Sequence, residues 1–124
     1  MTVGLATGNA NAAVAAVILD ADFFQLHTGD PGANGTANVS AETDRKAATF
    51  GSPSAGSVSA TGSPLASWAT WDAGSETITH VSLWSASTAG TFQYSFALTA
   101  SKAVTNGDTL NLTSHSVSAS PLAA

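Results

Sequence analysis

The chain has 124 residues, eight acidic and three basic side chains, a formal net charge of −5 and no cysteine. Three basic residues cannot neutralise a run of phosphates, which argues against a nucleic-acid partner, and a chain without cysteine forms no disulfide and offers no thiolate. Only 9% of the residues are charged, while 25 Ala, 17 Ser and 16 Thr fill almost half of the positions. The length predicts a single domain over residues 1–124, and the scarcity of charge favours a surface that is buried in an assembly.

The N-terminal segment 1–22 is predicted to hold the one helix of the chain, at residues 9–21. Asn9 or Asn11 can cap its first turn, because an Asn side-chain oxygen accepts a hydrogen bond from a free backbone amide. The apolar run at 12–19 is shorter than the roughly 20 residues that span a bilayer, and no basic residue precedes it. We therefore expect no membrane partner and no secretory signal. The residues that recur at helical spacing on one face are Val14, Val17 and Ile18.

After the helix the apolar pattern alternates with a period of two, which is typical of strands. Polar loops rich in Gly, Asn, Pro and Ser separate these stretches at 29–44 and 51–64, and Asn106-Gly107-Asp108 marks a tight turn. About seven or eight short strands over 23–119 predict a mostly β fold, either an antiparallel β-sandwich or a jelly-roll-like barrel. The predicted strands are 23–27, 45–50, 57–61, 78–85, 91–99, 109–113 and 115–119.

The stretch 78–85 has apolar residues on both faces, which indicates a central strand or one whose outer face meets a partner. Val81 and Leu83 share one face, and Ile78 and Trp84 share the other. The stretch 91–99 alternates between apolar and polar residues, which predicts one buried face. The residues expected to point inward from it are Phe92, Tyr94, Phe96 and Leu98.

No pattern in the chain predicts catalysis, a metal site or a cofactor. There is no Gly-x-Ser-x-Gly elbow for a nucleophilic serine and no glycine-rich loop that opens a helix. The spacing of Asp20, Asp22 and His27 fits neither a calcium loop nor a zinc motif, so we interpret the two carboxylates as solvated turn residues. Glu42 and Glu76 could form a glycosidase pair only if the fold brought them into one cleft.

The three tryptophans, Trp68, Trp71 and Trp84, are the most informative large side chains. A chain this rich in small residues needs them to fill its core and a subunit interface. The alternative is a platform on which sugar rings stack, which requires the tryptophans to be exposed.

The stretch Leu26-His27-Thr28-Gly29-Asp30-Pro31-Gly32 resembles a Leu-His-Thr-x-Asp-Pro-Gly motif. Short virion proteins of tailed bacteriophages carry this motif and are labelled tail fibre, minor tail or head-decoration proteins. The resemblance extends in order over most of the chain. Its further segments are Gly35–Val39, Arg45–Ala47, Ile78–Trp84, Ala97–Val104 and Asn106–Thr109.

The resemblance implies a non-enzymatic structural subunit of a phage particle, made in the host cytoplasm and located on the capsid or tail. Its implied partners are other virion proteins, namely the major capsid protein or tail proteins. We also expect the chain to form a homo-oligomer. The chain has no heptad or collagen repeat, which favours a compact capsid decoration protein over a self-standing fibre. The alternative is a minor tail or tail-tip protein, including one that binds a host glycan. The residues expected in or near the protein-contact loops are His27, Asp30, Pro31, Asn34, Asn38 and Trp84.

Overall fold

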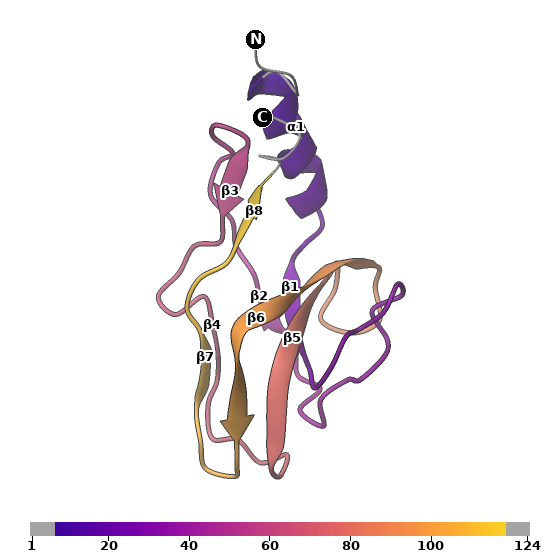
Figure 1. The fold of residues 1–124 in the computed structure, drawn as a ribbon, viewed down its shortest axis with the longest axis vertical. Coiled ribbons are helices and arrows are strands. Elements are labelled where there is room, and N and C mark those ends of the chain that lie inside the picture. Colours follow the sequence, from indigo (N-terminus) through magenta and orange to yellow (C-terminus); the bar gives the residue numbers. More distant parts are fainter. Residues whose placement is uncertain (1–6, 119–124) are drawn as a thin grey trace.

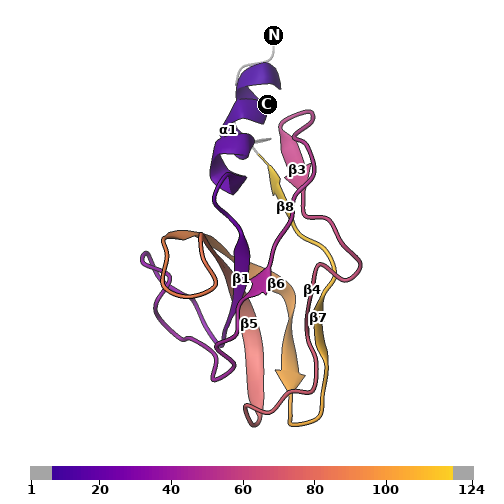
Figure 2. The same ribbon diagram turned by 180° about the vertical axis from the view of Figure 1, so that it is seen from behind.

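The computed structural model describes residues 7–118 and is elongated, with the helix α1 (Thr7–Ile18) and the strands β3 and β8 at one end (Figures 1 and 2). The fold is mostly β with antiparallel pairing, as predicted, and it is sandwich-like without closing into a barrel. The strands are β1 (Phe23–His27), β2 (Lys46–Ala47), β3 (Ser57–Ser59), β4 (Ala66–Trp68), β5 (Glu76–Trp84), β6 (Phe92–Val104), β7 (Leu110–Leu112) and β8 (Ser116–Ser118).

The main layer is a four-stranded sheet in the order β2-β1-β5-β6. β1 and β5 lie at its centre and are buried on both faces, which confirms the interpretation of the 78–85 stretch as a central strand. The long strand β6 forms one edge, and it continues to Val104, beyond the predicted end at Thr99. Residues 99–103 are exposed and lack an alternating apolar pattern, so only the backbone pairing of this part of β6 with β5 identifies it as strand.

The core lies between one face of this sheet and the ribbon formed by β4 and β7. Phe24 and Leu26 of β1 contact the same cluster as Trp68 of β4 and Leu110 and Leu112 of β7. Successive side chains of a strand point to opposite faces, so the remaining residues of β1 lie on the other face of the sheet. The loops 28–45 and 85–91 cover them there. The core is completed by Ala21, Ala66, Trp71, Ile78, Val81, Leu83 and Val104.

The helix α1 packs on the second ribbon, formed by β3 and β8, through a smaller cluster. Ala10 and Val14 are buried one helical turn apart and contact Val58 of β3. Ile18 and Phe50 contact both clusters, so they connect the helical end of the molecule to the sheet.

The predicted helix is confirmed, but its boundaries, its caps and one of its buried residues were wrong. The helix starts before Asn9, so Asn9 and Asn11 lie inside it, and Asn11 Oδ1 instead accepts the backbone N–H of Gly56 at 2.7 Å. Val17 is 40% exposed. The small residue Ala10, which periodicity in larger side chains overlooks, takes the place expected for Val17 because it lets the helix approach the ribbon closely.

Several predicted strands are shorter than expected, and one strand was missed. The 45–50 stretch pairs only at Lys46–Ala47, and the 57–61 stretch only at Ser57–Ser59. β4 was not predicted, since three residues are too few to show alternation. The last residue of the predicted strand 115–119 lies outside the described residues.

Two side chains lie on the face opposite to the predicted one. The pairing of β5 with β6 shifts register between Ile78 and His80 and again between Leu83 and Trp84. Ile78 therefore joins the core with Val81, and Phe92 leaves it and packs on Trp84, with their ring centroids 5.5 Å apart. A bulge moves side chains between faces in a way that strict alternation does not foresee.

Candidate functional site

The outer face of the sheet carries a buried hydrogen-bonded relay at the end of β1. Trp84 Nε1 donates to Ser82 Oγ at 2.7 Å, and Ser82 Oγ lies 2.6 Å from His27 Nε2. The opposite ring nitrogen, His27 Nδ1, lies 2.9 Å from the carbonyl oxygen of Ala37. The carbonyl oxygen of Ala37 can only accept, so Nδ1 of His27 carries the proton. Nε2 of the neutral ring is then an acceptor, and the hydroxyl of Ser82 donates to it while it accepts from the indole.

Burial favours the neutral form of His27, and the relay ties the 28–40 loop to the sheet. Burial lowers the pKa of His27, partly offset by the hydrogen bond to Ala37, which favours the protonated ring. His27 and Ser82 are both 0% exposed. No substrate can reach the serine hydroxyl, so this Ser–His pair positions the loop and performs no acyl transfer.

The loop itself is ordered by side-chain contacts with its own backbone. Asp30 Oδ1 accepts the N–H of Gly32 at 2.9 Å, and Asn38 Nδ2 donates to the carbonyl of Asp30 at 3.0 Å. Gly32 and Gly35 adopt φ values of +76° and +71°, which glycine reaches without steric cost. A side chain at Gly35 would also overlap the ring of Phe92 beneath it.

The six residues predicted near contact loops divide into two groups. His27, Pro31 and Trp84 are buried in the chain, so they shape the loops from below. Asp30, Asn34 and Asn38 are exposed on the surface of the loop. The hydrogen bond between His27 and the carbonyl oxygen of Ala37 holds this loop in place on the sheet. Whether these three contact a partner remains a prediction.

Sequence reasoning missed Arg45 as a site residue. Its guanidinium carbon lies 4.1 Å from the centroid of the Trp84 ring, and its Nη1 donates to the carbonyl oxygens of Ala86 at 2.8 Å and Ala89 at 2.6 Å. This cation therefore fixes the 85–91 loop to the segment that precedes β2. The sequence feature that could have drawn attention to this residue is that Arg45 is the only arginine in the sequence.

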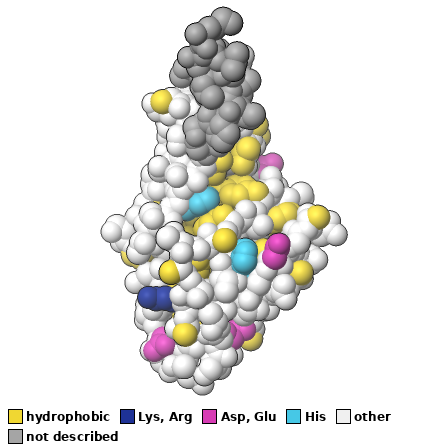
Figure 3. All heavy atoms as spheres, viewed as in Figure 1, with side chains coloured by type: hydrophobic (Ala, Val, Ile, Leu, Met, Phe, Trp, Pro, Cys, Tyr) yellow, Lys and Arg dark blue, Asp and Glu magenta, His cyan; other side chains and the backbone are white. Residues whose placement is uncertain are grey.

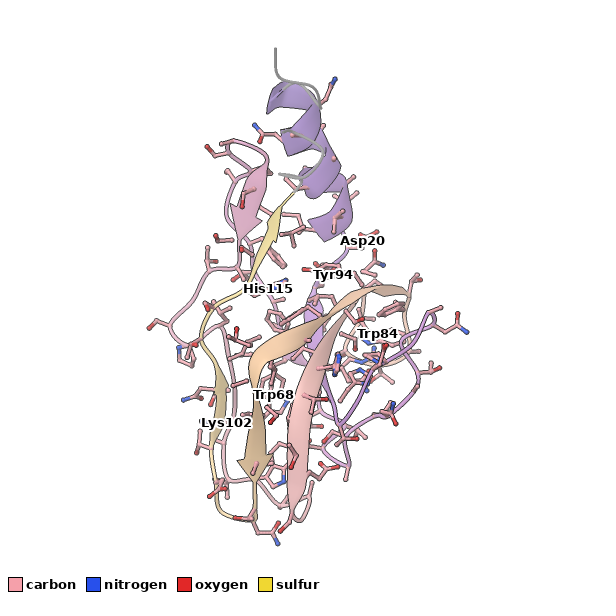
Figure 4. All side chains as sticks on the ribbon, viewed as in Figure 1. Asp20, Trp68, Trp84, Tyr94, Lys102 and His115 are labelled. Atoms are coloured by element: carbon pink, nitrogen blue, oxygen red, sulfur yellow. The ribbon has the colours of Figure 1, made fainter. Side chains whose placement is uncertain are left out.

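On the face shown in Figure 3, hydrophobic side chains gather in the middle beside a histidine, and charged side chains are few. A cleft of about 680 Å³ opens here between β6 and the 110–116 segment. His115 stacks on Phe96 with ring centroids 3.9 Å apart, and its Nε2 lies 2.8 Å from the hydroxyl of Tyr94 (Figure 4). Burial lowers the pKa of His115 to about 4 and raises that of Tyr94.

The tryptophans do not form the exposed platform that a sugar-stacking surface requires. Trp68, Trp71 and Trp84 are 2%, 1% and 8% exposed, which agrees with the predicted core role. Glu76 accepts hydrogen bonds from the hydroxyl of Ser40 and the backbone N–H of Ala41, and so it caps a loop. In the part of the chain that the structure describes, no three metal-ligating side chains come together.

Comparison with known proteins identifies the family of the chain. The family described as Podophage GP4 fiber I protein gp80 matches residues 5–120, which include every helix and strand described above. No curated protein matches the sequence. Among residues 7–118, no helix has the length and hydropathy needed to cross a membrane. The chain belongs to the Podophage GP4 fiber I protein gp80 family and is a structural protein of a phage virion.

Proposed function

We propose that the chain is a non-enzymatic subunit of the fibre or tail apparatus of a podophage particle. The match of residues 5–120 to a fibre protein family carries this proposal. The family match favours the tail alternative over capsid decoration. The sequence analysis favoured capsid decoration because the chain has no heptad or collagen repeat. The absence of these repeats argues only against a coiled-coil shaft and a collagen-like shaft, since a fibre can also be assembled from compact β modules.

The surface supports a role in assembly. β6 ends the sheet, and within residues 7–118 no strand pairs with its outer edge. Long unpaired edge strands are rare in proteins that stay monomeric, because their free N–H and C=O groups pair with strands of other chains. The cleft beside β6 is lined by apolar side chains such as Phe96, Leu98 and Leu112, with Lys102 as its only charged lining residue. We therefore propose that this side of the chain packs against further copies or other virion proteins.

The loop surface with Asp30, Asn34 and Asn38 is a second contact region in this proposal. Its shape is fixed before binding by the relay under it, which lowers the entropy lost on association. We also propose that the described residues unfold as one domain, because Ile18 and Phe50 join the two apolar clusters.

Location on the particle tests the main proposal. Antibodies raised against the purified chain and coupled to gold should label the fibres or tail of intact particles. Label confined to the head shell would overturn the tail assignment and favour capsid decoration. Sedimentation velocity over a range of concentrations tests self-association separately, and a single monomeric species at every concentration would refute the homo-oligomer.

A further inference from the structure

A depression of about 430 Å³ lies between the loops 43–45 and 87–89 on the outer face of the sheet. Its lining is polar and includes Gln25, Thr43, Arg45 and Thr88. The size falls within the range of about 300–1,000 Å³ that is usual for small-ligand sites. The described chain places no group inside it, so its polar atoms are available to a ligand.

The guanidinium of Arg45 is held rigidly at the wall of this depression. An arginine has five N–H groups, and the two on Nη1 bind the carbonyls of Ala86 and Ala89. Trp84 covers one face of the guanidinium and fixes its plane. Within residues 7–118 these two hydrogen bonds are the only ones that Arg45 makes. The Nε and Nη2 groups, which form a parallel pair of donors, therefore remain open.

Gln25 supplies a second observation at the same place. The register of β1 with β2, in which Phe24 pairs with Lys46, brings Gln25 opposite Arg45 when it is extended by one residue. Gln25 is only 7% exposed as a residue, and its side-chain amide takes part in none of the hydrogen bonds within the described chain. Within residues 7–118 no buried polar side-chain atom lacks a hydrogen-bond partner, so the polar atoms of this amide are in contact with solvent. Because Gln25 lines the depression, its amide is open to a ligand that enters there.

The geometry points to a binding site for one carboxylate group, held by the Nε–Nη2 edge of Arg45 and the side-chain amide of Gln25. A parallel pair of N–H donors matches the two oxygens of a carboxylate, and a charge-assisted pair of this kind is strong and directional. The amide nitrogen of Gln25 can donate a third hydrogen bond. Asp44 also lines the depression, and its negative charge repels a dianion more than a monoanion, which favours a carboxylate over phosphate.

We assign the carboxylate to an Asp or Glu side chain of a neighbouring virion subunit, and this assignment of the source rests on the proposed structural role. The chain has eight acidic side chains against three basic ones, so a second copy offers many carboxylates to this one rigid cation. Binding of a free carboxylate does not depend on the proposed role. An experiment can therefore refute the carboxylate site without refuting the proposed structural role, and the reverse also holds.

Nuclear magnetic resonance of the full chain tests the site directly, because the only arginine gives a single Nε–H signal. Sodium acetate, titrated against sodium chloride at constant ionic strength, should shift this signal to saturation. A chemical-shift change that grows linearly with acetate concentration, without saturation, would overturn the site. An equal change with sodium chloride would also overturn it. Sodium phosphate should bind more weakly than acetate at pH values where phosphate is a dianion, and stronger phosphate binding would overturn the assignment to a carboxylate.

Variants separate the site from a general charge effect. Gln25→Leu keeps the volume and should weaken acetate binding about fivefold, the usual effect of one hydrogen bond. Lys102→Gln removes one positive charge on the distant β6 and should leave acetate binding unchanged. Arg45→Lys keeps the charge but loses the donor pair, so acetate should no longer shift the indole N–H signal of Trp84. If Arg45→Lys does not fold, an unchanged affinity in Gln25→Leu is still sufficient to refute the site.

Two larger probes test the source of the carboxylate. N-acetyl-aspartate amide should bind at least as tightly as acetate if the partner is a protein side chain. Glucuronate should bind no more tightly than acetate. Markedly tighter binding of glucuronate would overturn the protein assignment and identify an acidic sugar as the ligand.

Discussion

The Ser82→Ala substitution should destabilise the fold by far more than the loss of one surface hydroxyl. Ser82 is 0% exposed and joins the indole of Trp84 to the imidazole of His27. Alanine would leave one buried donor and one buried acceptor without partners. At about 1–3 kcal/mol for each orphaned group, with partial relaxation, the free energy of unfolding should fall by about 2–4 kcal/mol. That is a large part of the roughly 5–15 kcal/mol available to a domain.

Urea unfolding followed by tryptophan fluorescence measures this change, with the protein concentration held fixed because association adds to apparent stability. The matched control is Ser95→Ala, since Ser95 pairs directly with Ser82 on the neighbouring strand and its hydroxyl makes no hydrogen bond within the described chain. The control should change the stability by less than about 0.5 kcal/mol. Equal effects of the two substitutions would refute the relay.

A double-mutant cycle with His27→Leu tests the energetic coupling between Ser82 and His27. Once the imidazole is gone, Ser82→Ala no longer orphans an acceptor and should cost about 1 kcal/mol less than in the natural sequence. Additive effects within error would show that Ser82 and His27 are not coupled, whatever their distance.

Three further outcomes follow from other parts of the fold. Burial holds the pKa of His115 at about 4, below its unfolded value near 6.5, so the unfolded state binds the proton more readily. Stability should therefore be complete above pH 6.5 and fall as the pH decreases toward 4, and His115→Phe should flatten this slope in urea midpoints measured at several pH values. Gly35→Ala adds a clash with Phe92 to its backbone strain, so it should cost at least about 1 kcal/mol more in thermal unfolding than Gly107→Ala, where the φ is also positive but the space is open. Val14→Ala should cost about 2 kcal/mol in urea unfolding, while Val17→Ala on the exposed side of α1 should cost less than about 0.5 kcal/mol, and equal costs would contradict the helix orientation.

Patterns that span many residues allowed the elements of this fold to be predicted. The alternation at 91–99, the two-sided apolar run at 78–85 and the Asn106-Gly107-Asp108 turn each correspond to observed structure. Boundaries were less predictable. β2 and β4 have two and three residues, and they exist because β1 and β7 lie beside them, which local sequence does not encode.

The candidate site was predictable only in outline. The Leu-His-Thr-x-Asp-Pro-Gly resemblance placed attention on His27, but its partner Ser82 lies 55 positions away and is one of 17 serines. The contact between Arg45 and Trp84 was equally hard to predict, since it forms only when two segments far apart in the chain come together. Side chains that act through tertiary contacts of this kind show no periodicity, so spacing alone could not find them.

The acidity of the chain also has a structural cause that composition could not reveal. Asp30, Glu42, Glu76 and Asp108 each accept a backbone N–H in a loop or turn. A fold with long loops leaves many amides outside its ladders, and a short carboxylate is an effective acceptor for them. Half of the eight acidic residues are used in this way, without a basic residue opposite. Loop ordering therefore accounts for half of the acidic side chains behind the net charge of −5. Arg45, whose guanidinium is held by the carbonyls of Ala86 and Ala89, is the cation to which we propose that an external carboxylate binds.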